Sequence, residues 1–318
     1  MASVDALDFA VYRALSPDGA ARFWASRRLI DPRITAQQVA DQVGLSEAGV
    51  RGRLRSLRER GYLRGSDVWL NPGLFGASVD CLDVPVEDSA AARQLLKDLA
   101  LVDGVIFARD ILDEEDRKVR VHFVYDGAVA ETRRVNLIRR LAGRKGFRGP
   151  KPYYVPPTER RLSPLDWRIV RALRDAPDAP FSEVARSVRI TVKTFGRRLH
   201  GLLDDRAIWW THDRETLEMP LAMVTARLRP PARAGELAGT LGAGFPPWMP
   251  VPPDGFGLPP TEGASYEVGL MLTVSPAAVE AAIQTLLDLP AVVSVRRTFT
   301  LGFGVYPEWF DERVRGHL

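Results

Sequence analysis

The chain has 318 residues, 46% of them hydrophobic, a composition that favours packed domains over disorder. The single cysteine excludes an intrachain disulfide framework and a cysteine-rich zinc site, and no apolar run approaches the roughly 20 residues that span a bilayer. The net charge of +4 is compatible with nucleic acid but does not indicate it. The N-terminus lacks the pattern of a secretion signal, so we expect a cytoplasmic protein with no membrane partner.

Residues 1–75 predict three helices, with a short turn before the third. The first two are expected over residues 7–15 and 35–43, and the third begins after Ser46, whose hydroxyl can cap a helix. The third helix places apolar residues on one face, namely Val50, Leu54 and Leu57. This is the pattern of a helix-turn-helix, whose last helix can enter the major groove of DNA. A strand is expected to follow over residues 62–70.

Each apolar residue of the third helix is followed by an arginine. These residues, which we call the arginine stripe, are Arg51, Arg55 and Arg58. They lie about 100° round the helix from the apolar face. Arginine suits phosphates and guanine edges because its planar fork donates two hydrogen bonds together. The expected contacts with double-stranded DNA are Ser46, Glu47, Arg51, Arg53, Arg55 and Arg58. The alternative is a solvated basic face paired with Glu47 and Glu59.

Residues 76–156 predict a domain of order βαββαβ, which is a ferredoxin-like fold. Alternating apolar residues indicate its strands, and helical periodicity indicates its helices. The expected strands cover residues 78–86, 105–112, 119–125 and 153–155, and the expected helices cover 90–101 and 128–141. The proline-rich and basic segment 143–164 predicts an exposed, semi-rigid linker.

The second half of the chain repeats this organisation. We therefore predict an α+β fold, in which two helix-turn-helix domains alternate with two ferredoxin-like domains. A diverged helix-turn-helix is expected over residues 157–218 and a second ferredoxin-like domain over 219–318. The latter should contain strands at 221–228, 266–274 and 292–303, and helices at 235–241 and 276–289. Its remaining strand falls in a proline-rich insertion at 242–263, where the sequence does not fix its position. The first unit holds an extra segment within residues 16–33.

The two copies of the third helix differ in charge. The second copy begins after Thr191 and keeps the apolar face. The positions of the arginine stripe are occupied by Gly196, His200 and Leu203. Positive charge remains on other faces, and the candidate DNA contacts of this copy are Lys193, Thr194 and Arg197. The alternative is a degenerate module kept for packing, so base reading is expected mainly from the first copy.

Four stretches of the first unit resemble the Lrp/AsnC family of leucine-responsive, or feast/famine, regulators. They run from Leu7 to Leu15, Val39 to Ser46, Val50 to Leu63 and Leu70 to Pro72. The resemblance implies a DNA-binding transcriptional regulator. Family members usually carry one such unit and dimerise through the βαββαβ domain, so two fused units imply a covalent pseudo-dimer whose two ferredoxin-like domains pack against each other. Pairing of two such chains into a homodimer is left open.

The resemblance also implies a small-molecule effector. The residues Gly263, Tyr266 and Glu267 resemble the Gly-x-Tyr-Asp turn that leads a central strand of the family's effector domain. We expect an effector pocket near them, with an ordinary hairpin as the alternative. The four histidines are dispersed, and no phosphate-binding glycine loop or dinucleotide fingerprint is present. We therefore predict no catalytic residue, no metal and no cofactor.

Two other functions stay open. Siroheme decarboxylases resemble the same family and pair two related units, which makes an enzyme the chief alternative. The stretch 106–125 lacks the His-Asn-Tyr-x-Arg and Tyr-Asn-Leu-Trp-Phe motifs of that group, and His122 lies there without their context. The third possibility is an architectural protein that coats DNA without sequence preference. Comparable affinity for random and selected duplexes would favour it.

Overall fold

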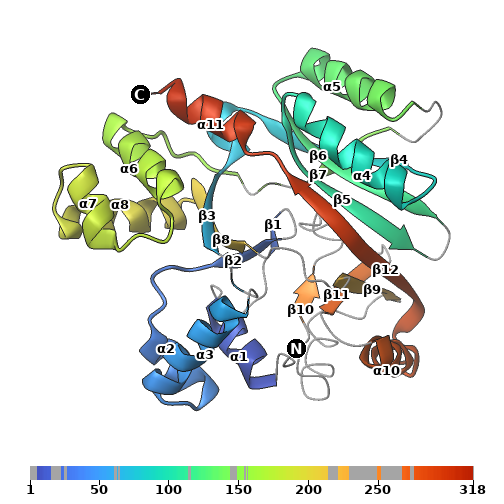
Figure 1. The fold of residues 1–318 in the computed structure, drawn as a ribbon, viewed down its shortest axis with the longest axis horizontal. Coiled ribbons are helices and arrows are strands. Elements are labelled where there is room, and N and C mark those ends of the chain that lie inside the picture. Colours follow the sequence, from blue (N-terminus) through green and yellow to red (C-terminus); the bar gives the residue numbers. More distant parts are fainter. Residues whose placement is uncertain are drawn as a thin grey trace.

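Two β-sheets connect the helical parts of the molecule (Figure 1). The computed structural model describes residues 6–15, 23–24, 27–60, 63, 65–113, 116–143, 149–153, 155, 157–213, 221–228, 249–251, 267–272 and 276–317. Their mixture of helix-turn-helix and ferredoxin-like parts confirms the predicted α+β class. Among the described helices, none is both long and apolar enough to cross a membrane.

The first helix-turn-helix has a small core of its own. Its helices are α1 (Ala6–Ala14), α2 (Ala36–Val43) and α3 (Glu47–Glu59). Thr35 and Gln38 form a capping box at the start of α2, and Gly44, with φ 70°, ends that helix in the left-handed conformation. The buried residues that hold the three helices together are Val11, Ala14, Val39, Ala40 and Val50.

The second helix-turn-helix is built into the main core of the molecule. Its helices are α6 (Pro164–Asp175), α7 (Phe181–Ser187) and α8 (Val192–Asp204). The apolar face of α8 belongs to a large buried cluster that also contains Trp69, from the first unit, and Phe310, near the C-terminus. These two rings meet edge to face, with centroids 5.2 Å apart. The two copies of the motif therefore pack in different ways.

The smaller sheet joins the two helix-turn-helix units. Its strands are β1 (Phe23–Trp24), β2 (Arg27–Ile30), β3 (Gly65–Leu70) and β8 (Ile208–Asp213), in the order β1-β2-β8-β3. Strand β3 follows the first unit and β8 follows the second, and the two pair antiparallel along their whole length. Strands β1 and β2 come from the extra segment of the first unit. That segment therefore forms a hairpin that extends the shared sheet.

The first ferredoxin-like domain has the predicted order of elements. They are β4 (Ser78–Pro85), α4 (Ser89–Asp98), β5 (Val105–Asp113), β6 (Arg117–Tyr125), α5 (Ala128–Leu141) and β7 (Lys151–Tyr153). The short helices η2 (Pro72–Phe75) and η3 (Leu99–Leu101) precede β4 and follow α4. Helices α4 and α5 cover one face of the sheet, where apolar side chains such as Leu82, Ala108 and Val121 form the core.

The second ferredoxin-like domain repeats the strand order of the first. Its described elements are β9 (Leu221–Leu228), β10 (Met249–Val251), β11 (Glu267–Leu272), α10 (Pro276–Leu287) and β12 (Val292–Val305). Strand β10 pairs with β11 and supplies the strand that the sequence could not place. The orders β10-β11-β9-β12 and β5-β6-β4-β7 correspond element by element. The helix expected at 235–241 lies outside the described residues.

Strand β12 unites the two ferredoxin-like sheets into one sheet of eight strands (Figure 1). It pairs with β9 between Val292 and Thr300, and with β5 between Thr298 and Val305. Strand β5 would otherwise lie at the edge of the first domain, where unpaired backbone groups invite aggregation. The two domains are thus continuous through backbone hydrogen bonds, which the expectation of simple packing did not include.

A C-terminal helix, α11 (Glu308–Arg315), is absent from the sequence-based prediction. It contacts α6 of the second helix-turn-helix and β5 of the first ferredoxin-like domain. Its buried residues Trp309, Phe310 and Val314 follow the spacing of an amphipathic helix. The spacing of these three apolar residues is the signal for the helix in the sequence.

The segment 143–164 differs from the predicted exposed linker. In its described part, the Thr158 hydroxyl donates a hydrogen bond to the Asp205 carbonyl oxygen at 2.8 Å. The guanidinium of Arg160 lies 2.6 Å from the Asp205 carboxylate. This part of the segment is therefore docked on the end of α8 rather than extended into solvent.

Two arginines of the second unit have the backbone conformation that favours glycine. Arg189, between α7 and α8, has φ 59°, and Arg206, after α8, has φ 56°. The first unit has glycine at both matching positions, Gly44 and Gly61. A side chain in the left-handed region costs roughly 1–2 kcal/mol, because Cβ approaches the following carbonyl oxygen. Arg189 therefore keeps the left-handed turn geometry that Gly44 has in the first unit, although its residue type opposes it.

We expect Arg206→Gly to stabilise the protein by about 0.5–1 kcal/mol, since glycine removes the left-handed strain at a smaller entropic cost. Urea unfolding of the full chain, followed by tryptophan fluorescence and circular dichroism, measures this as a higher midpoint. Arg206→Ala is the matched control, because it removes the same charge and retains Cβ. Equal midpoints for the two variants would contradict the explanation by strain.

Candidate nucleic-acid interface

The exposed face of α3 carries the arginine stripe. All three of its arginines are exposed, while Val50 and Leu57 are buried on the other side of the helix. The Ser46 hydroxyl accepts a hydrogen bond from the Gly49 amide at 3.1 Å and fixes the first turn. A capped helix therefore presents three guanidinium groups to solvent.

Glu47 holds Arg51 in the unbound protein. The Arg51 Nη2 and Nε atoms lie 2.5 Å and 3.0 Å from Oε1 of Glu47. The pair spans one turn of helix and the Arg51 side chain is 65% exposed, so it adds little stability. Within the described part of the chain, the side chains of Arg55 and Arg58 make no hydrogen bond or ion pair. Glu47 would repel phosphate, and we interpret it as a group that positions Arg51.

Arg53 turns toward the protein, unlike the arginines of the stripe. Its Nη1 atom lies 2.6 Å from Oδ1 of Asp8, and Arg60 reaches the other oxygen at 3.4 Å. Asp8 belongs to α1 and is 5% exposed. Arg53 therefore ties the third helix to the first, and its expected contact with DNA stays a prediction.

The second unit repeats this interior pair. Asp166, which is 2% exposed, accepts from Arg198 at 3.5 Å and is approached by Arg160 at 3.6 Å. Arg198 occupies the position that matches Arg53. The repeat contained the signal for this role, because the pair survives in both copies whereas the arginine stripe does not.

The exposed face of α8 has fewer cations than that of α3. Lys193 and Arg197 are exposed, and the half-buried Thr194 hydroxyl accepts a hydrogen bond from Thr191 at 3.0 Å. At the stripe positions, His200 is exposed and replaces an arginine of the first copy. Leu203 instead packs against the main buried cluster. In the second copy, part of the face that carries arginine in the first copy therefore packs against the core.

The predicted effector residues are only partly described. Gly263 and Tyr266 lie outside the described residues. Glu267 begins β11 and stands opposite Arg227 of β9 in the sheet. The expected effector pocket therefore stays a prediction.

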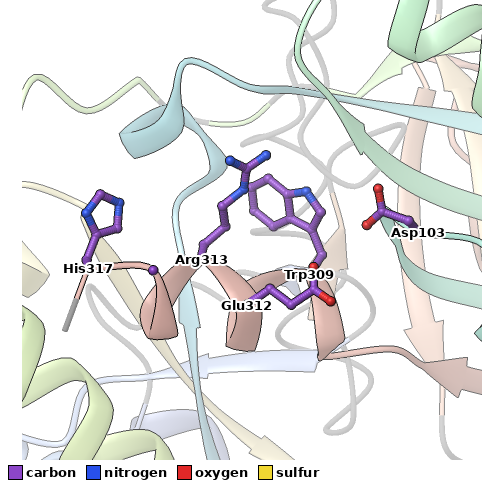
Figure 2. A pocket seen from close by; sticks show the side chains of 6 residues that line it. Asp103, Trp309, Glu312, Arg313 and His317 are labelled. Carbon is purple, nitrogen blue, oxygen red and sulfur yellow. The ribbon is translucent and has the colours of Figure 1, made fainter.

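A shallow depression of about 320 Å³ lies between α11 and the first ferredoxin-like domain (Figure 2). Asp103 faces it from the sheet side and Trp309 from α11, as Figure 2 shows. Arg134 contacts the Asp103 carboxylate at 3.1 Å, and the Arg313 guanidinium lies 5.1 Å from the centre of the Trp309 ring. Since Asp103 and Arg313 already have partners, we interpret this depression as the joint between α11 and the domain. In the part of the chain that the structure describes, no three His, Cys, Asp or Glu side chains form a metal-binding group.

Residues 30–64 match a protein family described as "Winged helix-turn-helix DNA-binding". The matched segment contains α2, the turn and α3 with its arginine stripe. The chain thus includes a winged helix-turn-helix DNA-binding domain. Among curated proteins, none matches the sequence significantly.

Two solved structures of one protein align with 98% of the chain, and a third structure aligns with about half of it. The siroheme decarboxylase NirDL is 14% identical, with a TM-score of 0.53 and 98% of both chains covered. NirDL in complex with an iron-uroporphyrin III analogue gives 16% identity and a TM-score of 0.52, with 98% of this chain and 99% of that chain covered. Escherichia coli AsnC is 14% identical over 51% of this chain and 97% of its own, with a TM-score of 0.32. At these identities, the NirDL structures show a shared fold alone.

We expect Asp8→Asn to destabilise the first helix-turn-helix by roughly 2 kcal/mol, because it removes charge-assisted hydrogen bonds from a buried carboxylate. Faster amide hydrogen exchange in α1, α2 and α3 measures the effect. Glu47→Gln makes the same chemical change at an exposed pair and is the matched control, with a change within about 0.5 kcal/mol. Similar exchange rates in both variants would refute the structural role of the interior pair.

Proposed function

We propose that the chain is a DNA-binding transcriptional regulator of the Lrp/AsnC type, in which one polypeptide forms a covalent pseudo-dimer. One observation carries this proposal: the arginine stripe is exposed on α3, within the segment that matches a winged helix-turn-helix. Arginine side chains on the groove-facing side of such a helix can bind phosphates and read guanine edges.

Each candidate residue of α3 has a distinct part in this proposal. The arginine stripe contacts the duplex, and Ser46 fixes the start of the helix. When DNA binds, a phosphate takes the place of Glu47 as the partner of Arg51. Arg53 acts indirectly, by holding α3 on α1 through Asp8. The separation of contacting and positioning residues makes the interface testable by substitution.

The second unit would mainly contact the phosphate backbone of the DNA. Lys193 and Arg197 provide positive charge on α8, which lacks the arginine stripe. Charge of this kind adds affinity without sequence information. A palindromic site would then require the first unit of a second chain, so we propose that two chains pair on such DNA. A small-molecule effector near Gly263, Tyr266 and Glu267 belongs to the same proposal.

The Arg51→Ala/Arg55→Ala/Arg58→Ala variant should lose at least about tenfold in affinity for a duplex selected from a random pool. Its log–log salt slope should fall by up to about 2.7, since each lost phosphate contact removes about 0.9. Fluorescence anisotropy at several salt concentrations measures both quantities. The variant Arg93→Ala/Arg168→Ala/Arg171→Ala removes the same charge from exposed positions on α4 and α6. An equal loss in this control, or no loss in the first variant, would sink the proposed interface.

A second candidate is a siroheme decarboxylase-like enzyme. The similarity of fold to NirDL over 98% of both chains favours it, because that protein also spans two fused units. The motifs expected for that activity are missing between 106 and 125. DNA binding and this chemistry make different demands on the chain, so a direct assay separates them.

As a regulator, the purified chain should release no CO₂ from siroheme under anaerobic conditions. We expect this because the two motifs associated with that reaction, and therefore their side chains, are absent from residues 106–125. Mass spectrometry of the recovered tetrapyrrole measures the number of carboxylates retained. Loss of carboxylates at a rate proportional to the protein concentration would contradict the regulator proposal and support the decarboxylase.

A further inference from the structure

One face of the first ferredoxin-like sheet carries a row of charged residues. The strand register places Arg109 of β5 opposite Arg120 of β6, and Arg120 opposite Asp83 of β4. Side chains that are directly opposite in an antiparallel pair lie on the same face. The alternate residues belong to the core under α4 and α5, so this row lies on the other face of the sheet.

Arg109 is the uncompensated charge of the row. Arg120 binds both carboxylate oxygens of Asp83, at 2.6 Å and 2.8 Å. The Nε atom of Arg109 is buried without a hydrogen-bond partner, and within the described chain its side chain makes no ion pair. Burial, and then the charge of Arg120, lower the pKa of Arg109 to about 10, so it stays protonated at neutral pH. An unpaired cation in such a place is destabilising unless an anion reaches it.

His122 adds two more unsatisfied groups beside this cation. It is 3% exposed, and neither of its ring nitrogens has a hydrogen-bond partner among the residues that the structure describes. Its ring lies against Tyr153, with centroids 4.7 Å apart, and against Phe107, at 5.7 Å. Burial, followed by the nearby Arg109, holds the pKa of His122 well below its usual range, so the imidazole is neutral. Buried polar atoms without a partner are rare in folded proteins and call for a physical reason.

Apolar rings border the same place. Phe303 of β12 stands directly opposite Arg109, on the side away from Arg120. Its ring centroid lies 6.2 Å from that of Phe107. The surroundings therefore combine one cationic fork and one neutral N–H donor with aromatic side chains. They match a monoanion attached to an apolar group better than a highly charged ion, which would need more cations.

We propose that Arg109 and His122 form a binding site for the carboxylate of a small organic acid, with Phe107 and Phe303 against its apolar part. The guanidinium fork can donate two parallel hydrogen bonds to a carboxylate. The His122 ring can donate a further one. The polar groups of the site belong to the first unit and Phe303 to the second. The site is apart from the predicted effector residues, and it does not depend on the proposed DNA binding.

The test uses thermal unfolding of the full chain with acetate, glutarate and benzoate, against sodium chloride at equal ionic strength. Binding to the folded state should raise Tm with ligand concentration, by roughly 2 °C or more once the ligand is well above Kd. Benzamide has the same ring without the charge and should leave Tm unchanged. The proposal is overturned if none of the three carboxylates raises Tm, or if benzamide raises it as much as benzoate.

Variants locate the response. Arg109→Met should abolish the carboxylate-dependent rise in Tm, while the unbound variant folds, because methionine removes an unpaired charge at similar length. Arg109→Lys keeps the charge without the fork and should bind at least about tenfold more weakly. Arg93→Met loses an exposed arginine of the same domain and should respond like the unaltered protein. A full response in Arg109→Met would refute the site.

The unaltered protein provides a readout that does not depend on any variant folding. Benzoate should shift the ring resonances of His122 in nuclear magnetic resonance spectra. The exposed His200 is the internal control and should not shift. Unchanged His122 resonances at a benzoate concentration that raises Tm would place binding elsewhere and reject the proposal.

Discussion

Backbone pairing between the two repeated units is the constraint on which the rest of this structure depends. Strand β3 of the first unit pairs with β8 of the second, and β12 of the second pairs with β5 of the first. The buried Asn71 strengthens the first of these joints, since its amide groups donate to the Ala207 and Arg206 carbonyl oxygens at 2.9 Å. Because both partners belong to one chain, the joints form without the loss of translational freedom that separate subunits would incur.

This covalent arrangement permits the two copies to diverge. The second helix-turn-helix shares its core with β3 and α11, so Leu203 can serve packing where the first copy has Arg58. The first copy keeps a separate small core, and its charged face is free of such packing. An identical dimer could not divide the work in this way, because every substitution would appear in both subunits. Asymmetry in packing and asymmetry in charge therefore have the same origin.

Local patterns allowed most elements to be predicted from the sequence. Caps at Ser46 and Thr191 and the helical spacing of apolar residues depend on neighbours along the chain, and these predictions agree with the structure. The double pairing of β12 depends on two distant strands and leaves no local signature. The same limit applies to the candidate sites. The periodicity separated the stripe from the core, but it could not show that Arg53 reaches Asp8. The row of Arg109, Arg120 and Asp83 can be identified only from the register of the three strands that carry them.

The position of Arg109 connects the proposed carboxylate site with the joint between the units. Its neighbour on one side is Arg120 of the same domain, and on the other side it is Phe303 of the strand that arrives from the second unit. A ligand at this point would contact both halves of the chain and neutralise a charge beside their shared strand. Binding energy at such a joint stabilises whichever arrangement of the halves presents the complete site. Through this unpaired cation, binding of a small acid would be coupled to the arrangement of the two units.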